Sequence, residues 1–395
     1  MTDATDIEYS PIEVFASPTR GGTPATVFGS PGRYVQGDGV IDHAGHYLCR
    51  QGFASALVLA SARSFAAEGA RLMSSLAAAE VRAVPAEFAG ECSFEEIDRH
   101  VTAARALTDP CDVVVAIGGG KAVDAGRAIA DRLDVESVIV PSLASNDAPT
   151  AALSVIYSPE GVTVDAEVYA RNPALVLMDT GIVAQAGERY LAAGMADSMA
   201  TWFEARATAR SGHGVNVFGG RPTRVATAIA RLCRETLLEH GRAAIADVRE
   251  GRVSEALEAV VEANTLMSGL GYESGGLAAA HAVAQGFTVL DAVHRNKLHG
   301  EMVAMGTLTQ LLLEDDLAEA RNIATFFAAV GLPVTLAGLG VERDDAESLA
   351  AVVGGALSFP FLGNMHPHTV DKEALHRALL DADALGATIT AESFG

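Results

Sequence analysis

The hydrophobic positions of this chain change their spacing near residue 184. Before this point, short continuous apolar runs alternate with stretches whose apolar residues recur at helical spacing. Continuous apolar runs are typical of strands buried on both faces, and their alternation with helices indicates βαβ units around a parallel sheet. The predicted strands are Ala56–Ala60, Val81–Pro85, Val113–Ile117, Ser137–Val140 and Leu175–Met178, with Leu153–Tyr157 as a further candidate.

After residue 184 the strand pattern ends and helical spacing dominates. We therefore predict an α/β domain with a Rossmann-like parallel sheet over residues 1–183 and an all-helical domain over residues 184–395. An active cleft is expected at the carboxyl ends of the strands, facing the helical domain. The predicted helices are Gly194–Ala209, Arg221–Glu239, Ser254–Tyr272, Gly276–Gly286, Gly300–Leu313, Ala318–Gly331 and Lys372–Ala384.

Composition narrows the class of protein. Hydrophobic residues make up 49% of the 395 positions and charged residues only 20%, which is typical of a folded globular chain. A net charge of −22 argues against nucleic-acid binding. No apolar run approaches the roughly 18 residues of a membrane span, and the acidic start at residues 1–6 differs from a secretory signal. Because the four cysteines are scattered, with no C-x-x-C pair, we expect reduced thiols in a cytoplasmic protein.

Three consecutive glycines mark a candidate ligand-binding turn. Gly118, Gly119 and Gly120 follow the apolar run Val113–Ile117 directly, and a helical pattern begins at Ala122. Glycines there let a ligand approach the backbone, and the N–H groups at a helix start favour an anion such as a phosphate or pyrophosphate. The alternative is an ordinary strand-to-helix turn. The pattern is neither a P-loop nor the G-x-G-x-x-G motif.

Chemistry in the helical half centres on Asp197, His281 and His299. The two histidines are 18 positions apart, about 27 Å along one unbroken helix. They can share a metal only if the chain reverses between them, which the irregular stretch after Gly286 permits. One carboxylate and two imidazoles suit zinc with an open position for water or substrate. The alternative is a pair of core or capping histidines and an unrelated helix aspartate.

Four motifs occur in a fixed order along the chain, namely Gly118–Asp124, Ala144–Tyr157, Ala192–Ala205 and His299–Glu301. In this order they resemble the glycerol dehydrogenase branch of the iron-containing (group III) alcohol dehydrogenase superfamily. The likeness extends from about Pro31 to Gly386. It implies a dehydroquinate synthase-like architecture and a homo-oligomer, often an octamer.

The resemblance also implies site residues. Zinc would be held by Asp197, His281 and His299, and Asp147 would lie beside the substrate hydroxyls. Asp147 also suits the turn before Pro149, and Lys121 could simply be solvated. The dinucleotide would lie along the glycine turn, with its pyrophosphate near Gly120 to Asp124. The full set of implied cofactor contacts is Gly118, Gly119, Gly120, Lys121, Asp124, Ser142, Ser145, Ala151, Leu153, Tyr157 and, near the far ribose, Ser61.

The residue at position 201 indicates whether the site would hold zinc or iron. Iron-binding relatives carry a histidine one helical turn after the aspartate, and this chain has Thr201 there, a poor ligand. We therefore expect zinc, acting as a Lewis acid. The implied reaction transfers a hydride from a zinc-bound polyol or vicinal diol to NAD.

Two departures from the family pattern affect specificity. The family has an aspartate for the adenosine ribose where this chain has Ser61, followed two residues later by Arg63. Loss of that carboxylate removes repulsion of a 2′-phosphate, so NADP use is plausible. Ala284-Gln285 replaces the usual His-Asn pair, which changes the pocket wall and leaves glycerol itself open as the substrate.

Several rival functions stay open. An NADP-dependent reductase of 2-oxoacids or hydroxyketones would use the same fold. A dehydroquinate synthase-like lyase or a glycerol-1-phosphate dehydrogenase needs basic groups for a phosphate, and the segments around Asp147 and His281 are poor in Lys and Arg. A non-catalytic role is disfavoured because all three candidate ligands and the glycine turn are present.

Overall fold

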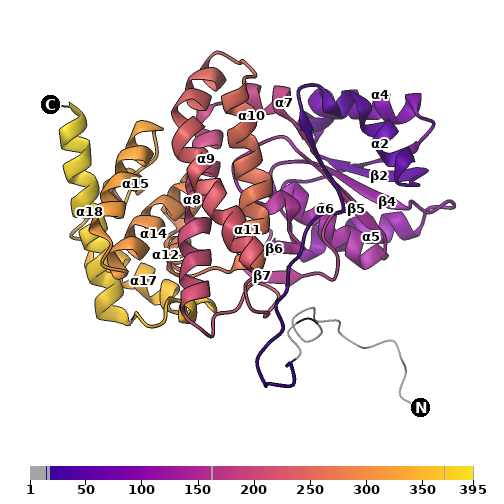
Figure 1. Ribbon diagram of the computed structural model, residues 1–395. Coiled ribbons are helices and arrows are strands. Elements are labelled where there is room, and N and C mark those ends of the chain that lie inside the picture. Colours follow the sequence, from indigo (N-terminus) through magenta and orange to yellow (C-terminus); the bar gives the residue numbers. More distant parts are fainter. Residues whose placement is uncertain (1–14, 16–17, 162, 369, 395) are drawn as a thin grey trace.

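A six-stranded parallel sheet forms the centre of the N-terminal half in the computed structural model, which describes residues 15, 18–161, 163–368 and 370–394 (Figure 1). All five pairings between neighbouring strands are parallel, and the order is β1-β8-β5-β4-β2-β3. The predicted fold class, an α/β region followed by a helical one, is confirmed. The strands of this sheet are β1 (Tyr34–Gly37), β2 (Ser55–Ala60), β3 (Arg82–Glu87), β4 (Val113–Gly118), β5 (Glu136–Pro141) and β8 (Leu175–Asp179).

Helices cover both faces of the sheet. Strand β4 is buried along its whole length, and its alternate residues enter two separate cores: Val113, Val115 and Ile117 in one, Val114 and Ala116 in the other. Figure 1 shows α2 and α4 on one side and α5 and α6 on the other. The helices and turns of this half are η1 (Val40–His43), α2 (Ala44–Arg50), α3 (Ala62–Ser64), the π segment η2 (Phe65–Gly69), α4 (Ala70–Ala78), α5 (Phe94–Arg105), α6 (Gly120–Leu133), η3 (Ala148–Thr150) and α7 (Thr180–Ala186).

Two strands were not anticipated from the sequence, and one candidate strand has a separate location. The sequence pattern did not predict β1 or β7 (Thr163–Val168). The candidate over residues 153–157 is a strand, β6 (Leu153–Tyr157), but it pairs antiparallel with β7 in a two-stranded sheet outside the main one. This hairpin follows the loop that contains Asp147. Figure 1 shows β6 and β7 beside the helical half.

The helical half packs around α8, whose side chains are buried over most of its length. This helix begins at Glu188, before the predicted start at Gly194. The single helix predicted over residues 254–272 contains a π segment, η4, between α10 and α11. The elements are α8 (Glu188–Arg210), α9 (Arg224–Arg249), α10 (Glu255–Glu262), η4 (Ala263–Met267), α11 (Ser268–Gly275), α12 (Ala279–Phe287), α13 (Asp291–Asn296), α14 (His299–Leu313), α15 (Leu317–Ala329), α16 (Leu336–Leu339), α17 (Ala346–Leu357), η5 (Leu362–Met365) and α18 (Lys372–Phe394).

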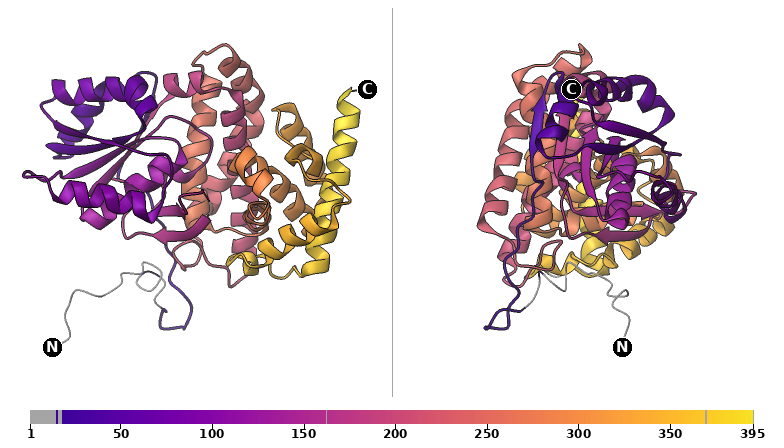
Figure 2. Two further views of the ribbon diagram at one scale, coloured as in Figure 1. Left: turned by 180° about the vertical axis from the view of Figure 1, so that it is seen from behind. Right: turned by 90° about the vertical axis from the view of Figure 1, so that its right-hand side faces the viewer.

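The two halves lie side by side, with α18 at the edge farthest from the sheet (Figure 2). The predicted boundary between residues 183 and 184 falls within α7 and stays a prediction. None of the helices that the structure describes combines the length and the apolar character needed to cross a membrane. The acidic start at residues 1–6 lies outside the described residues. The four cysteines Cys49, Cys92, Cys111 and Cys233 are free thiols in the structure.

Candidate metal and dinucleotide site

Asp197, His281 and His299 meet in space although they come from three helices. Asp197 is fully buried on α8, His281 lies on α12, and His299 is the first residue of α14. The short helix α13 turns the chain back between the two histidines. The Nε2 atoms of His281 and His299 each lie 3.3 Å from Oδ1 of Asp197, and one potential ligand atom from each residue lies within 4.8 Å of the others.

The geometry of this cluster suits a metal ion. Oδ1 of Asp197 is buried and receives no well-aligned hydrogen bond. Two ligands bound to zinc at about 2.0–2.1 Å with tetrahedral angles lie about 3.3 Å apart, which is the Nε2–Oδ1 separation found here for both histidines. The His299 side chain is 46% exposed, so the cluster is open on that side. The three residues therefore fit a metal with an accessible coordination position.

Close helix packing brings these ligands together. A Cβ on Gly194 would lie 2.0 Å from the carbonyl oxygen of Ala144, and one on Gly300 would lie 1.8 Å from that of Ala193. Only glycine permits these approaches, because real Cβ atoms do not come so near a backbone oxygen. Gly300 thus lets the start of α14, and His299 with it, lie against α8.

Asp147 links the loop after β5 to the cluster of Asp197, His281 and His299. Its backbone N–H donates to Oδ2 of Asp197 at 3.2 Å, and its own Oδ2 accepts from Ser268 Oγ at 2.8 Å. Ser268 Oγ is also hydrogen-bonded to Thr201 Oγ1 at 2.7 Å. Asp147 is therefore more than a turn residue: it is a buried carboxylate held beside the cluster.

The charges of the cluster shift its pKa values. Burial, and after it the negative charge of Asp197, raise the pKa of Asp147 well above its ordinary value. Burial alone would also raise the pKa of Asp197, but the neighbouring His299 and His281 outweigh it and hold that pKa low. In this site Asp197 therefore favours its charged form, whereas Asp147 favours its neutral form.

The glycine turn forms an open helix start next to this cluster. Gly118 has a φ of +148°, and Gly119, which precedes α6, provides no side-chain cap for the first N–H groups of the helix. The N–H of Ala122 bonds the Gly119 carbonyl at 3.0 Å, whereas those of Gly120 and Lys121 come too early in the helix to reach a carbonyl within it. A Cβ on Gly120 would lie 2.9 Å from Nδ2 of Asn146, so the turn lies against the residue that precedes Asp147. This arrangement is suited to an anionic group bound close to Asp197, His281 and His299.

The remaining predicted cofactor contacts differ in accessibility. Ser142 and Ser145 are half-buried, and the Ser142 N–H bonds the Gly118 carbonyl at 3.0 Å. Leu153 and Tyr157 are half-buried on β6, whereas Ala151 is fully buried. The Ala151 methyl group packs among Val217, Tyr272 and Leu277, so it does not face solvent.

Two charged residues of the predicted cofactor set are already paired. The Lys121 ammonium bonds both oxygens of Glu91 at 2.7 and 2.6 Å and lies 4.9 Å from the centre of the Tyr157 ring. It is therefore not simply solvated. The Asp124 carboxylate is buried and forms an ion pair with Arg127, one helical turn later. Neither side chain is free without a rearrangement of its partner.

Ser61 lies at the same edge of the sheet as the glycine turn. Strands β2 and β4 are in register at Ala60 and Ile117, so Ser61 lies beside Gly118. Its hydroxyl accepts from the N–H of Ser64 at 3.2 Å and caps the following helix. Arg63 is exposed in the first turn of that helix.

Sequence reasoning missed two residues that contact the site. Glu204, fully buried on α8, bonds Nδ1 of His281 at 2.6 Å. Its position seven residues after Asp197, two helical turns along the same face, was an available signal. Ser268 gave no such signal, because its contact with Asp147 depends on how α11 packs.

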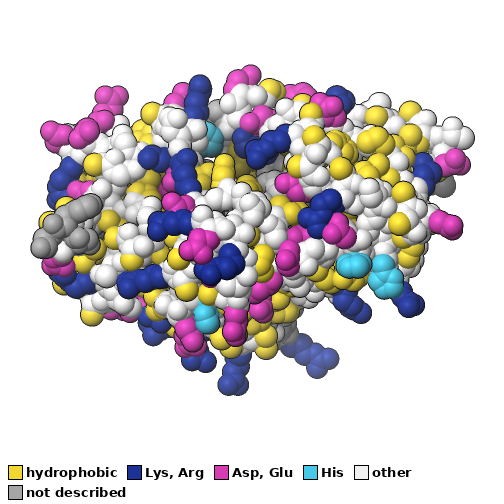
Figure 3. All heavy atoms as spheres, turned by 90° about the horizontal axis from the view of Figure 1, so that it is seen from above, with side chains coloured by type: hydrophobic (Ala, Val, Ile, Leu, Met, Phe, Trp, Pro, Cys, Tyr) yellow, Lys and Arg dark blue, Asp and Glu magenta, His cyan; other side chains and the backbone are white. Residues whose placement is uncertain are grey.

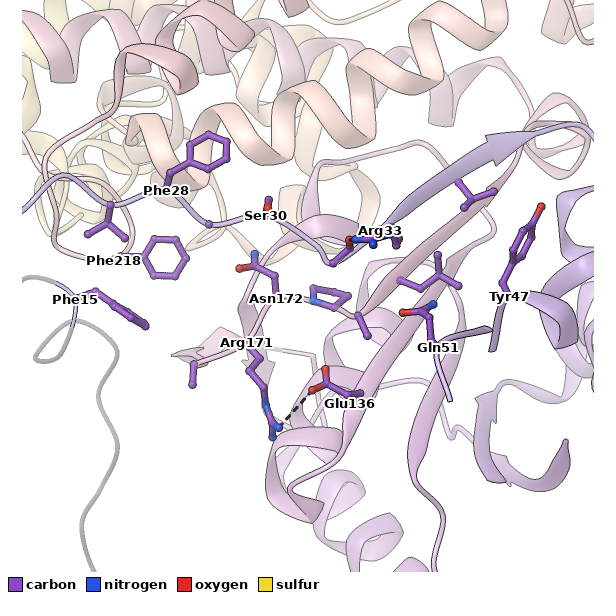
Figure 4. A pocket seen from close by; sticks show the side chains of 18 of the residues that line it. Phe15, Phe28, Ser30, Arg33, Tyr47, Gln51, Glu136, Arg171, Asn172 and Phe218 are labelled. Atoms are coloured by element: carbon purple, nitrogen blue, oxygen red, sulfur yellow. Dashed lines mark hydrogen bonds and ion pairs between the residues drawn. The ribbon is translucent and has the colours of Figure 1, made fainter. Parts of the chain in front are cut away.

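A separate cavity of 1310 Å³ lies at the opposite edge of the sheet. Its lining includes Arg33, Glu136 and Leu175, which lie at the amino ends of β1, β5 and β8. Figure 4 shows Phe15, Phe28 and Phe218 together on one side of it and Tyr47 and Gln51 on the other. None of the predicted site residues lines this cavity, so its size does not make it the candidate active site.

Charges of both signs are mixed over the surface seen in Figure 3, where Lys and Arg side chains lie among acidic and hydrophobic ones. On this face the described residues form no continuous basic area.

Comparison with known proteins identifies the family. Residues 31–180 match the family model described as iron-containing alcohol dehydrogenase. A glycerol dehydrogenase of Thermotoga maritima is 44% identical over 91% of this chain and 97% of its own length. The chain belongs to the iron-containing alcohol dehydrogenase family. The predicted resemblance and the prediction of an enzyme are thereby confirmed.

Two further proteins are similar to this chain over most of its length. A glycolaldehyde reductase of Halobacterium salinarum is 42% identical over 92% of this chain and 99% of its own length. Among solved structures, the glycerol dehydrogenase of Schizosaccharomyces pombe superposes with a TM-score of 0.88 at 35% identity, covering 96% of this chain and 94% of that one. These matches extend the family likeness across both halves of the chain.

Proposed function

We propose that the chain is a zinc-dependent oxidoreductase that transfers a hydride between a polyol or vicinal diol and NAD. The observation that supports this most is the position of Asp197 Oδ1, buried without a hydrogen bond 3.3 Å from two imidazole nitrogens. The loop that contains Asp147 connects this atom to the glycine turn at Gly120. Metal, substrate and dinucleotide sites would therefore adjoin.

The residues of the chain have distinct tasks in this proposal. Asp197, His281 and His299 would hold zinc, which supplies Lewis-acid stabilisation of an alkoxide. Asp147 has one oxygen bonded by Ser268, and its other oxygen would accept a hydrogen bond from a substrate hydroxyl and fix its orientation. The N–H groups at the start of α6 would bind the pyrophosphate and hold the dinucleotide over the cluster.

Zinc is favoured over iron by the surroundings of Thr201. Its hydroxyl bonds Ser268 at 2.7 Å, and a Cβ on Gly271 would lie 2.5 Å from its methyl group. The position that holds a histidine in iron-binding relatives is thus occupied by a small hydroxyl side chain that is a poor metal ligand and already has a hydrogen-bond partner. Three protein ligands and an open position are typical of catalytic zinc.

The first alternative is a reductase of hydroxyaldehydes, hydroxyketones or 2-oxoacids that uses NADP. The relative named glycolaldehyde reductase supports the reduction of a hydroxyaldehyde. Use of NADP is supported by Ser61 and Arg63, since neither places a carboxylate where it would repel a 2′-phosphate. A phosphorylated substrate, as for a dehydroquinate synthase-like lyase, is disfavoured. Lys121 is paired with Glu91, and Arg127 is paired with Asp124 and bonded to the Ala148 carbonyl.

The experiment that tests the proposal is a matrix of NAD and NADP against glycerol, 1,2-diols, hydroxyacetone, glycolaldehyde and 2-oxoacids. Each assay is run with zinc-loaded and chelator-treated protein. We expect chelator-sensitive oxidation of a vicinal diol that returns when zinc is added. Absence of such activity on every vicinal diol and its ketone would refute the proposal. The homo-oligomer, an octamer by resemblance, and the cytoplasmic location stay predictions.

A further inference from the structure

Glu204 is a buried carboxylate that contacts one metal-site histidine from behind. It lies on α8 with no exposed surface. Its Oε2 lies 2.6 Å from Nδ1 of His281, on the opposite side of the ring from the Nε2 that faces Asp197. Its Oε1 accepts two backbone N–H groups, those of Ala278 at 2.8 Å and His281 at 2.9 Å.

We propose that Glu204 is a positioning residue that fixes the His281 ring with its hydrogen on Nδ1 and its Nε2 lone pair directed at the metal. A carboxylate only accepts hydrogen bonds, so the ring nitrogen that contacts it must be the one that carries hydrogen. Carboxylates behind ligating histidines orient the ring and increase its basicity, and their loss typically lowers metal affinity 10- to 100-fold. The inference rests on the proposed metal site.

The two oxygens of Glu204 have separable roles. Helix α12 begins after Ala278, which offers no side-chain cap, and Oε1 satisfies N–H groups there that would otherwise lack partners. Oε2 alone contacts the imidazole. A purely structural role would depend on Oε1, whereas the positioning role depends on Oε2.

The substitution Glu204→Gln distinguishes these roles. The glutamine oxygen can still accept the N–H groups of Ala278 and His281, which keeps the start of α12 intact. Its NH₂ group then faces Nδ1 and cannot accept a hydrogen from it. The ring would place its hydrogen on Nε2 or rotate, and either change removes the ligand atom from the metal.

Glu273→Gln provides a matched control. Glu273 is likewise fully buried and accepts from a backbone N–H, that of Ala152, and from Asn172, with no histidine among its hydrogen-bond donors. Zinc affinity is measured for the intact chain and both variants by competition with a chromogenic chelator. Thermal unfolding of each metal-free protein is followed in parallel.

We expect Glu204→Gln to weaken zinc binding 10- to 100-fold, with a metal-free unfolding temperature close to that of the parent chain. Glu273→Gln should leave zinc affinity within about twofold of the parent chain. The inference is overturned if Glu204→Gln binds zinc as tightly as the parent, or if Glu273→Gln weakens binding equally. If the parent chain itself binds no zinc, the proposed metal site fails instead.

A second measurement needs no Glu204 variant. In the zinc-loaded parent chain, the ¹H–¹⁵N spectrum of the histidine side chains should contain a slowly exchanging ring N–H at Nδ1 of His281. Its assignment comes from its absence in His281→Ala. A His281 ring with hydrogen on Nε2, or with an Nδ1–H that exchanges as fast as an exposed histidine's, would contradict the inference even if Glu204→Gln failed to fold.

Discussion

The backbone N–H of Asp147 donates a hydrogen bond to Oδ2 of Asp197 at 3.2 Å. The other oxygen of Asp197, Oδ1, faces the imidazoles of His281 and His299. One carboxylate therefore joins the loop after β5 to the helical half while keeping an oxygen for a metal. Because the bond to Asp197 comes from the backbone N–H of Asp147, the position of Asp147 relative to the metal does not depend on a flexible side chain.

Close packing at Gly300 should be essential for the cluster. Gly300→Ala would place a methyl group 1.8 Å from the Ala193 carbonyl oxygen, so α14 must move and carry His299 away from Asp197. We expect a loss of stability of about 1–3 kcal/mol or more and at least a tenfold loss of zinc affinity. Both can be measured by thermal unfolding and chelator competition.

Gly354→Ala is the matched control, because Gly354 lies within α17 with nothing near its potential Cβ. This substitution should be neutral or stabilise the helix by up to about 1 kcal/mol. Equal behaviour of the two variants would show that the approach of α14 to α8 does not set the ligand positions.

The sequence predicted the buried strands of the fold better than the exposed ones. Strand β4 is apolar throughout because it is covered on both faces. Strand β1 has four half-buried residues ending in glycine, and β7 carries Val164 with 53% exposure, so neither shows the continuous apolar pattern. The first turn of α8, Glu188 to Tyr190, is exposed, so it carries no apolar position at helical spacing from which its start could be predicted.

Site residues were predictable where a local pattern carried the information. The glycines after β4 and the residues Asp197, His281 and His299 could be named in advance, although only the folded chain shows that α13 brings the histidines together. Asp124 could have been recognised as an ion-pair partner of Arg127 from its spacing of three residues. The spacing of seven residues places Glu204 on the same face of α8 as Asp197, but its contact with His281 spans 77 residues and depends on the packing of α12 against α8.

Asp147 should act on turnover rather than on metal binding. Asp147→Asn retains the backbone N–H that bonds Asp197, so zinc content should not change. Loss of the carboxylate that orients the substrate hydroxyl should lower kcat/KM about 10²-fold. Ser268→Ala, which keeps the Asp147 carboxylate but removes the hydroxyl that bonds it and Thr201, should lower it less. Steady-state kinetics with zinc analysis checks both, and loss of zinc from Asp147→Asn would contradict this assignment.

Glu273 should make stability depend on pH. Burial raises its pKa from 4.5 to about 7, so the folded chain binds this proton more tightly than the unfolded chain does. The stabilisation is fully present below about pH 4.5 and is lost as pH rises through about 7. It amounts to about 3 kcal/mol at most.

The check on Glu273 is denaturant unfolding of the parent chain and of Glu273→Gln across this pH range. Glutamine does not titrate, so the free energy of unfolding of the parent chain should fall relative to that of the variant as pH rises. Parallel profiles for the two proteins would show that Glu273 has an ordinary pKa.

Ser61 should control nucleotide choice. Ser61→Asp places a carboxylate beside the glycine turn, where it can accept from ribose hydroxyls and repel a 2′-phosphate. We expect the KM for NADP to rise at least tenfold while the KM for NAD stays equal or falls. Arg63→Ala should raise only the KM for NADP, and Arg210→Ala, an exposed arginine at the far end of α8, should change neither. Equal effects of Ser61→Asp on both nucleotides would place the adenosine ribose elsewhere.

In the proposed function Asp197, His281 and His299 together hold one zinc ion. This assignment is tested most directly by anomalous diffraction at the zinc absorption edge from crystals grown with zinc, NAD and glycerol. We expect one strong peak per chain, about 2.0–2.2 Å from Oδ1 of Asp197 and from Nε2 of each histidine. No peak among these three residues, or a dominant peak elsewhere in the chain, would contradict it.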